Sequence, residues 1–207
     1  RLYSSVELCD RDTSSANLKG LFLSTQNVVI LNTDVILPKN WASRLLYPII
    51  KNDKVASVTP FSNAANIFSL PENCKDNNFN GNLERVNHYI SKLNINNEIM
   101  NFPTGVGFCM AISKNALKDV GYFDEIFNKG YGEENDWYQR AIKKGYLNSI
   151  ASNLFVWHKH GGSFNYSEKQ KLIKKNLNII KKRYPKFLKD IKTLLNDNEK
   201  FLSLRFF

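Results

Sequence analysis

Residues 28–35, with the sequence VVILNTDV, decide the fold of this chain. The first four of them are apolar with no polar alternation, which is typical of a strand covered on both faces, as in a parallel sheet. Asn32-Thr33-Asp34 ends the apolar run, and open α/β sheets bind ligands at the carboxyl ends of their strands. Asp34 is therefore a candidate ligand for a divalent cation, because hard cations prefer oxygen. The alternative is a turn that starts a helix, since Asn, Thr and Asp all favour turns and caps.

Apolar segments and amphipathic segments alternate along the rest of the chain, which predicts an α/β protein. Further strands are predicted at 54–59, 108–112, 146–151 and 154–157. Helices are predicted at 41–50, 82–93, 114–120 and 133–144, then from Tyr166 to an interruption at Pro185, and from 187 to 207.

The connecting segments contain turn-forming residues. We expect Pro60 to end the second strand, because proline has no N–H for a sheet. Residues 61–81 are rich in Asn, Pro and Asp, which predicts a long loop. Residues 1–26 are polar, with a helix start expected at Ser14. This first segment is interpreted as the tail of a longer element.

The composition of the 207 residues argues against several classes of protein. With 43% apolar and 13% aromatic residues, the chain can bury a core and is not disordered. Its three cysteines form no Cys-x-x-Cys pair, which argues against a zinc site or a disulfide framework and favours a reducing, cytoplasmic setting. No apolar run approaches the ~18 residues of a membrane-spanning helix.

The formal net charge of +10 indicates an anionic partner, and much of it lies after Lys159. The predicted helix that begins at Tyr166 has lysines on one face and apolar residues on the other, which suits an anionic membrane at the inner face of the cell. The alternative is a solvated face packed on its own domain. Nucleic acid is not expected, because no aromatic residues are interleaved with these basic ones.

Three more segments are candidates for a functional site. The sequence GEEND at 132–136 opens a predicted helix, and three neighbouring carboxylates raise the pKa of at least one of them, as a general base requires. The alternative is that these acids stabilise the helix dipole. His158 follows a strand and is either a metal ligand or a structural histidine. The Gly105-x-Gly107 pair is weak evidence for phosphate binding, and a turn before a strand is the preferred reading.

The order of these segments resembles that of the inverting family 2 glycosyltransferases, and GEEND is the most specific part. The segments that carry this resemblance are LNTDV at 31–35, PKNW at 38–41, TPFSN at 59–63, PTGVGF at 103–108, VGYFDE at 120–125, GYGEEND at 130–136 and residues 158–164. The resemblance implies a GT-A fold, with a mixed, mainly parallel sheet flanked by helices. Residues 1–165 would form a partial GT-A domain, and 166–207 a basic amphipathic helical extension.

The resemblance also implies an activity. A sugar would move from a nucleotide-diphosphate donor to a glycan or lipid-linked acceptor, as in the synthesis of cell-surface polysaccharide. Asn32 and Asp34 would bind the donor, and Asp34 and His158 would hold Mg²⁺ or Mn²⁺. The acceptor side would be lined by Gly105, Val106 and Gly107.

Glu134 lies where the family has its catalytic base, with Asp136 as the rival assignment and Glu133 as a supporting residue. The base would deprotonate an acceptor hydroxyl, whose oxygen then displaces the nucleotide diphosphate with inversion. The strand-and-helix segment with which family members begin has no recognisable counterpart in residues 1–26, so the chain is read as lacking part of the nucleotide-binding region. The alternatives are a truncated, non-catalytic glycan- or partner-binding module and a basic peripheral-membrane protein.

Overall fold

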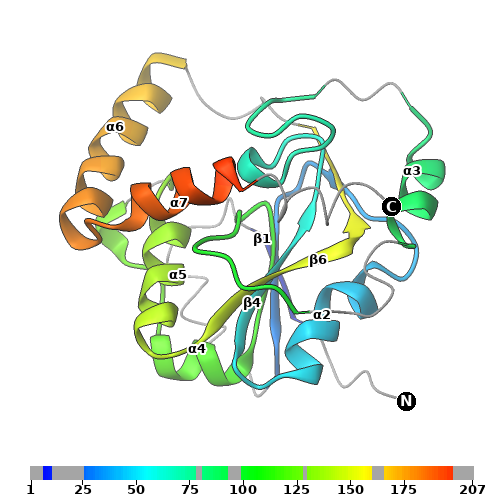
Figure 1. The fold of residues 1–207 in the computed structure, drawn as a ribbon, viewed down its shortest axis with the longest axis horizontal. Helices are drawn as coiled ribbons and strands as arrows, with labels where there is room; N and C mark the ends of the chain where they lie inside the picture. The colour runs from blue at the N-terminus through cyan, green and yellow to red at the C-terminus, as the bar shows by residue number, and fades with distance from the viewer. Residues whose placement is uncertain are drawn as a thin grey trace.

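The structure is a computed structural model that describes residues 26–77, 81–92, 99–127, 130–159 and 166–197, together with the backbone of 7–10. Within these residues the main sheet has five strands in the order β1-β2-β5-β4-β6 (Figure 1). Their bounds are β1 Glu7–Asp10, β2 Val28–Leu31, β4 Val55–Phe61, β5 Cys109–Ile112 and β6 Leu147–Phe155.

The sheet is mixed and mainly parallel, as expected. β1 pairs in parallel with β2, and β4 pairs in parallel with β6. β5 lies between β2 and β4 and is antiparallel to both, so it alone in this sheet runs in the opposite direction. A separate two-stranded sheet pairs β3 (Val35–Ile36) with β7 (Trp157–His158), which places His158 opposite Val35.

Helices cover both faces of the sheet, which explains why β2 lacks polar alternation. Val29 of β2 packs in the same cluster as side chains of α2 (Trp41–Lys51) and α3 (Leu83–Ile90). Val28 and Ile30 point to the other face, where they pack with α4 (Lys114–Val120) and α5 (Glu133–Lys143). Figure 1 shows α2 and α3 on one side of the sheet and α4 and α5 on the other.

The ends of α4 are set by local chemistry. The side chain of Ser113 caps the helix by accepting a 3.1 Å hydrogen bond from the N–H of Ala116. Gly121 follows with φ +85°, a conformation that favours glycine. The predicted start and stop of this helix are both confirmed.

Two helices end the described part of the chain, α6 (Tyr166–Arg183) and α7 (Phe187–Asn196). Ile180, Tyr184 and Phe187 pack around the buried ring of Phe127 in the short 3-10 helix η2 (Glu125–Phe127), and Leu194 joins the main core. The predicted extension thus packs against the preceding residues, and its division from them at residue 165 stays a prediction. In the part of the chain that the structure covers, no helix is both long and apolar enough to cross a bilayer.

Several predicted boundaries were wrong. Pro60 lies inside β4, where its missing N–H is tolerated because β5 pairs with β4 only at Ser57 and Val58. The two strands predicted at 146–157 are one strand, β6, followed by β7. Residues 7–10 form an edge strand where none was expected.

The predicted loop after β4 is more ordered than its composition indicated. It contains the 3-10 helix η1 (Asn66–Phe68), whose Phe68 is fully buried against the ring of Phe102. The helix start expected at Ser14 and the end of the helix predicted to run to 207 lie outside the described residues.

Candidate active site

The structure brings together three predicted site residues from opposite ends of the sequence. The Nε2 atom of His158, in β7, lies 3.2 Å from the amide nitrogen of Asn32 and 3.2 Å from Oδ1 of Asp34. Asn32 and Asp34 follow the carboxyl end of β2, and the β3–β7 pairing carries His158 to them. The His158 side chain is buried, whereas that of Asp34 is 35% exposed, so the site opens to solvent on the carboxylate side.

The surroundings of His158 determine which ring nitrogen carries the proton. Nδ1 lies 3.0 Å from the backbone oxygen of Ala64, which can only accept a hydrogen bond. Nδ1 therefore donates, and in the neutral ring Nε2 presents its lone pair to Asn32 and Asp34. The ring of Phe108 stacks on the imidazole with a centroid separation of 5.1 Å and an interplanar angle of 17°, which restricts its rotation.

These residues fit a divalent cation. The Nε2 lone pair and the Asp34 carboxylate are both electron-rich and close together, and a shared cation would offset their repulsion. Among the described residues the buried Oδ1 of Asn32 has no hydrogen-bond partner, so it too is a candidate for such an ion. The described residues hold no group of three or more His, Cys, Asp or Glu side chains suited to a metal. Water and phosphate oxygens would complete the shell, as is usual for Mg²⁺.

Glu133 and Glu134 open α5, next to an unusual turn. The N–H of Gly132 points at both carboxylates, 3.1 Å from Oε2 of Glu133 and 3.3 Å from Oε2 of Glu134. Gly130, Tyr131 and Gly132 all have positive φ, and Tyr131 at +63° is a residue that rarely adopts it. Both glutamates are partly exposed, in contrast to the buried Asp136.

Asp136, the rival candidate for the base, is fully buried. Arg140 donates to its Oδ2 at 2.8 Å, and Arg183 and the Tyr184 hydroxyl donate to its Oδ1, each at 2.8 Å. The hydrogen bonds to Asp136 and Asp124 raise the pKa of Arg183, and burial together with the bond to Asp136 raises the pKa of Tyr184. Both carboxylate oxygens of Asp136 accept hydrogen bonds within the core, so its role is structural. Glu134 is therefore the better candidate for proton transfer.

The predicted acceptor segment connects the two polar groups. The hydroxyl of Thr104 donates to the Asn135 side chain at 2.8 Å, which ties this segment to the residue after Glu134. At its other end, the backbone oxygen of Phe108 accepts a 2.8 Å bond from the N–H of Asn32. The residues between are close-packed: Gly105 and Gly107 are buried, and Val106 is partly so.

Gly105 has no room for a side chain. A Cβ placed on it would overlap the hydroxyl of Tyr138 and lie 2.6 Å from Oγ1 of Thr59. The glycine is therefore required by close packing between this segment and α5, which supports the reading of Gly105-x-Gly107 as a turn rather than a phosphate loop.

Sequence reasoning assigned no role to Asn63, although it contacts His158 twice. Its side-chain amide donates to the backbone oxygen of His158 at 2.9 Å and accepts from the His158 N–H at 2.9 Å. One signal could have found it: Asn63 is a polar residue just past the end of an apolar strand, the position that singled out Asp34.

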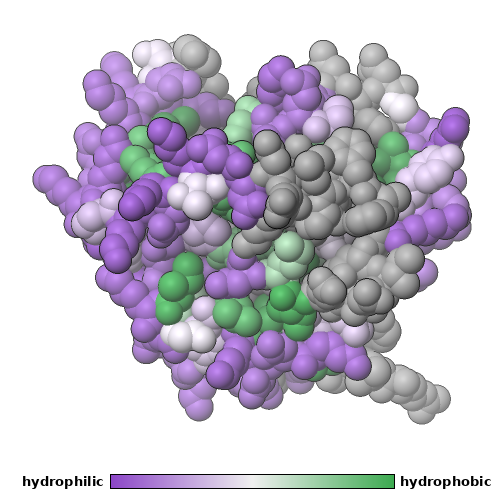
Figure 2. Space-filling view, viewed as in Figure 1, coloured by the Kyte–Doolittle hydropathy of each residue, from purple (hydrophilic) through white to green (hydrophobic). Residues whose placement is uncertain are grey.

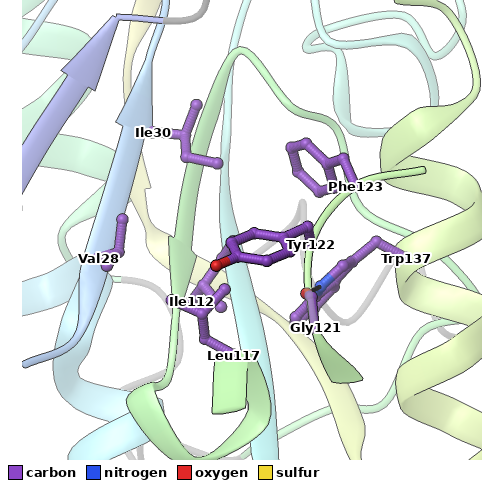
Figure 3. Close-up of a pocket in the computed structure, with 8 residues that line it drawn as sticks. All are labelled: Val28, Ile30, Ile112, Leu117, Gly121, Tyr122, Phe123 and Trp137. Atoms are coloured by element: carbon purple, nitrogen blue, oxygen red, sulfur yellow. Dashed lines mark hydrogen bonds between the residues drawn. The ribbon is translucent and has the colours of Figure 1, made fainter. Parts of the chain in front are cut away.

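An apolar pocket lies elsewhere, on the face of the sheet that α4 and α5 cover (Figure 3). None of the candidate site residues lines it. Its lining residues are Val28, Ile30, Ile112, Leu117, Gly121, Tyr122, Phe123 and Trp137.

This chain resembles known proteins in its structure but not in its sequence. No protein-family model matches the sequence, and no curated protein matches it significantly. Among solved structures, the chain is similar to GalNAc-T7, described as a crystal structure with UDP, GalNAc and Mn²⁺, with a TM-score of 0.53 and 16% identity. The match covers 80% of this chain and 34% of that one, so the chain spans about a third of the length of its neighbour. GalNAc-T7 is a GT-A glycosyltransferase, and the predicted GT-A fold is thereby confirmed.

Proposed function

We propose that this protein is a metal-dependent glycosyltransferase of the inverting, family 2 type. It would move a sugar from a nucleotide-diphosphate donor to a glycan or lipid-linked acceptor in the synthesis of cell-surface polysaccharide. The observation that carries the proposal is the convergence of Asn32, Asp34 and His158 beyond the carboxyl end of β2 in a GT-A fold. The UDP and Mn²⁺ named for GalNAc-T7 support the same kind of donor and cation here.

The residues of this chain would divide the reaction between them. Asp34 and His158 would hold Mg²⁺ or Mn²⁺, and Asn32 would orient the donor beside them. When bound, the cation offsets the negative charge of the departing nucleotide diphosphate. Glu134 would accept the proton of the acceptor hydroxyl, whose oxygen attacks the anomeric carbon from the side opposite the diphosphate. Gly105, Val106 and Gly107 would form the wall on the acceptor side, and Glu133 would support the base.

Binding of Mn²⁺ and UDP tests this proposal directly. Electron paramagnetic resonance measures free Mn²⁺ during titration of the full chain, with and without UDP, and tryptophan fluorescence follows the nucleotide. UDP should bind only with Mn²⁺, and Asp34→Asn should abolish both signals. Asp53→Asn, which removes an exposed carboxylate elsewhere, is the matched control. If UDP, thymidine diphosphate and guanosine diphosphate all failed to bind in the presence of Mn²⁺, the proposal would be wrong.

A second part of the proposal concerns the anionic membrane. Residues 166–197 contain nine lysines and one arginine but only three acidic residues, and hydrophilic side chains cover α6 and α7 in Figure 2. Leu188 of α7 is 40% exposed, whereas Phe187 and Tyr184, which lies between the two helices, are buried. Among the described side chains of this surface, exposed lysines lie beside an exposed leucine and these two rings are not available for stacking, which favours a lipid surface over nucleic acid. None of these nine lysines forms an ion pair inside the described part of the chain, and the ammonium of Lys169 lies over the ring of Tyr131.

Vesicle sedimentation tests the membrane contact. The chain should bind vesicles with 30% phosphatidylglycerol at low salt and leave them at high salt, because exposed charges are screened. The four substitutions K174Q, K175Q, K181Q and K182Q together should weaken binding at least ~10-fold, since each lysine near an anionic surface contributes about fivefold. The control removes four exposed lysines elsewhere, K54Q, K114Q, K118Q and K144Q. Equal loss in both variants, or binding to neutral vesicles, would overturn the proposal. So would a preference for single-stranded DNA.

A further inference from the structure

We propose that Asn63 is a positioning residue for His158: its side chain fixes the backbone of β7, so that the imidazole presents Nε2 to Asn32 and Asp34. The inference deepens the proposed function, because it rests on His158 as a ligand of the cation. Asn63 itself would touch neither cation nor donor and would act only through His158.

The hydrogen-bond pattern of the small sheet creates the need for such a residue. The N–H of Lys159 donates to the backbone oxygen of Asp34 at 2.9 Å, so Asp34 and Lys159 form a hydrogen-bonded pair. The next pair along the two strands, Val35 and His158, is therefore a pair without backbone hydrogen bonds between its members. In an antiparallel ladder the N–H and C=O of a residue in such a pair point away from its partner strand. The backbone of His158 therefore needs a hydrogen-bond partner on the far side, and His158 is buried.

The Asn63 side chain meets this need with both ends of its amide. Its Nδ2 donates to the His158 oxygen at 2.9 Å, and its Oδ1 accepts from the His158 N–H at 2.9 Å, as a neighbouring strand would. Asn63 is itself only 5% exposed, and its backbone oxygen accepts two bonds from Asn77. The hydroxyl of Ser62 also donates to Oδ1 of Asn63 at 3.3 Å, so the amide itself is held in place and holds the His158 backbone in turn.

The segment that contains Asn63 also fixes the tautomer of the His158 ring. Ala64 follows Asn63 directly, and its oxygen accepts from Nδ1 of His158 at 3.0 Å. A single two-residue segment therefore controls the position of the His158 backbone and the tautomer of its ring. Hydrogen bonds behind a metal-binding histidine commonly have this role, and their loss typically weakens metal binding 10–100-fold.

The chain contains only three histidines, which makes the tautomer measurable. Two-bond ¹H–¹⁵N correlation spectra of the full chain at pH ~8.5, above the ordinary imidazole range, should show His158 with the proton on Nδ1. A His158→Gln spectrum assigns the signal. In Asn63→Ala and in Asn63→Asp, which keeps the size but loses the donor, this signal should shift or become a mixture of tautomers.

Mn²⁺ affinity is the second readout, with thermal unfolding to show that each variant is folded. Asn63→Ala should raise the Mn²⁺ dissociation constant at least ~10-fold. The control is Asn87→Ala, which removes a 2.9 Å bond to Arg44 and makes no contact with His158. It should leave both the tautomer and the affinity unchanged.

The outcomes separate this inference from the proposed function. If His158 carries its proton on Nε2, or if folded Asn63 variants keep the native spectrum and affinity, Asn63 is not a positioning residue. If the native chain binds no Mn²⁺ while its tautomer depends on Asn63, the structural role stands and the metal role of His158 fails.

Discussion

Arg183 of α6 donates a single Nη1 to two carboxylates at once, Asp136 at 2.8 Å and Asp124 at 2.7 Å. Asp136 is completely buried in α5, whereas the Asp124 side chain is 36% exposed. The two contacts are almost equal in length but should differ in energy, because water screens only the second.

Replacing Asp136 should therefore cost far more stability than replacing Asp124. Asp136→Asn leaves Arg140 and Arg183 without their buried counter-charge, and we expect a loss of about 3–5 kcal/mol in the free energy of unfolding. Asp124→Asn should cost less than about 1 kcal/mol. Urea denaturation of both variants checks this. Similar losses in the two would show that burial does not set the strength of this network.

Tyr184 should make stability depend on alkaline pH. Burial and its bond to Asp136 raise its pKa above the ordinary value of 10, so the folded state keeps the proton longer than the unfolded state does. The stabilisation is complete below pH 10 and declines as the pH rises above it, because the unfolded state then gains by ionising. Unfolding free energies at pH 8 and pH 11 should fall more for the native chain than for Tyr184→Phe. Tyr89→Phe, at a 58% exposed position, should behave like the native chain.

Glu134 should be the residue on which turnover depends. Glu134→Gln keeps the size of the side chain but cannot accept a proton, and we expect transfer from the nucleotide-sugar that binds to fall ~10²–10⁴-fold. Donor binding should be unchanged, because Asp34 and His158 remain. Glu133→Gln is the matched comparison, since the same Gly132 N–H points at both carboxylates. A greater loss in Glu133→Gln would assign the base to that residue.

Gly105 should tolerate no substitution. In Gly105→Ala the new methyl group would overlap Tyr138 and crowd Thr59, both of them buried. The segment must then move away from α5, at a cost of about 1–3 kcal/mol. Thermal unfolding would measure the loss. A variant as stable as the native chain would mean that this segment and α5 separate freely, and the segment could not then form a fixed wall for the acceptor.

Much of the fold follows from local patterns in the sequence. The apolar run before Asn32 predicts a covered strand, because it is short, rich in β-branched residues and without polar alternation. Ser113 and Gly121 mark the ends of α4, since capping depends on neighbours within a few residues. The alternation of strands and helices predicted an α/β protein, and the resemblance of the ordered segments to family 2 glycosyltransferases implied a GT-A fold. Boundaries failed at Pro60 and in β6, where pairing with distant strands overrides local preference.

The contacts that define the candidate site were decided by tertiary structure alone. Asn63 and His158 are 95 residues apart in sequence, and Asp136 and Arg183 are 47 apart. Sequence could select histidine and aspartate as chemically able residues, but a side chain's tautomer, burial and partners depend on what the fold places around it. For this reason the sequence, which placed the base at Glu134, still left Asp136 as a rival, and the burial of Asp136 against Arg140, Arg183 and Tyr184 now argues against that rival.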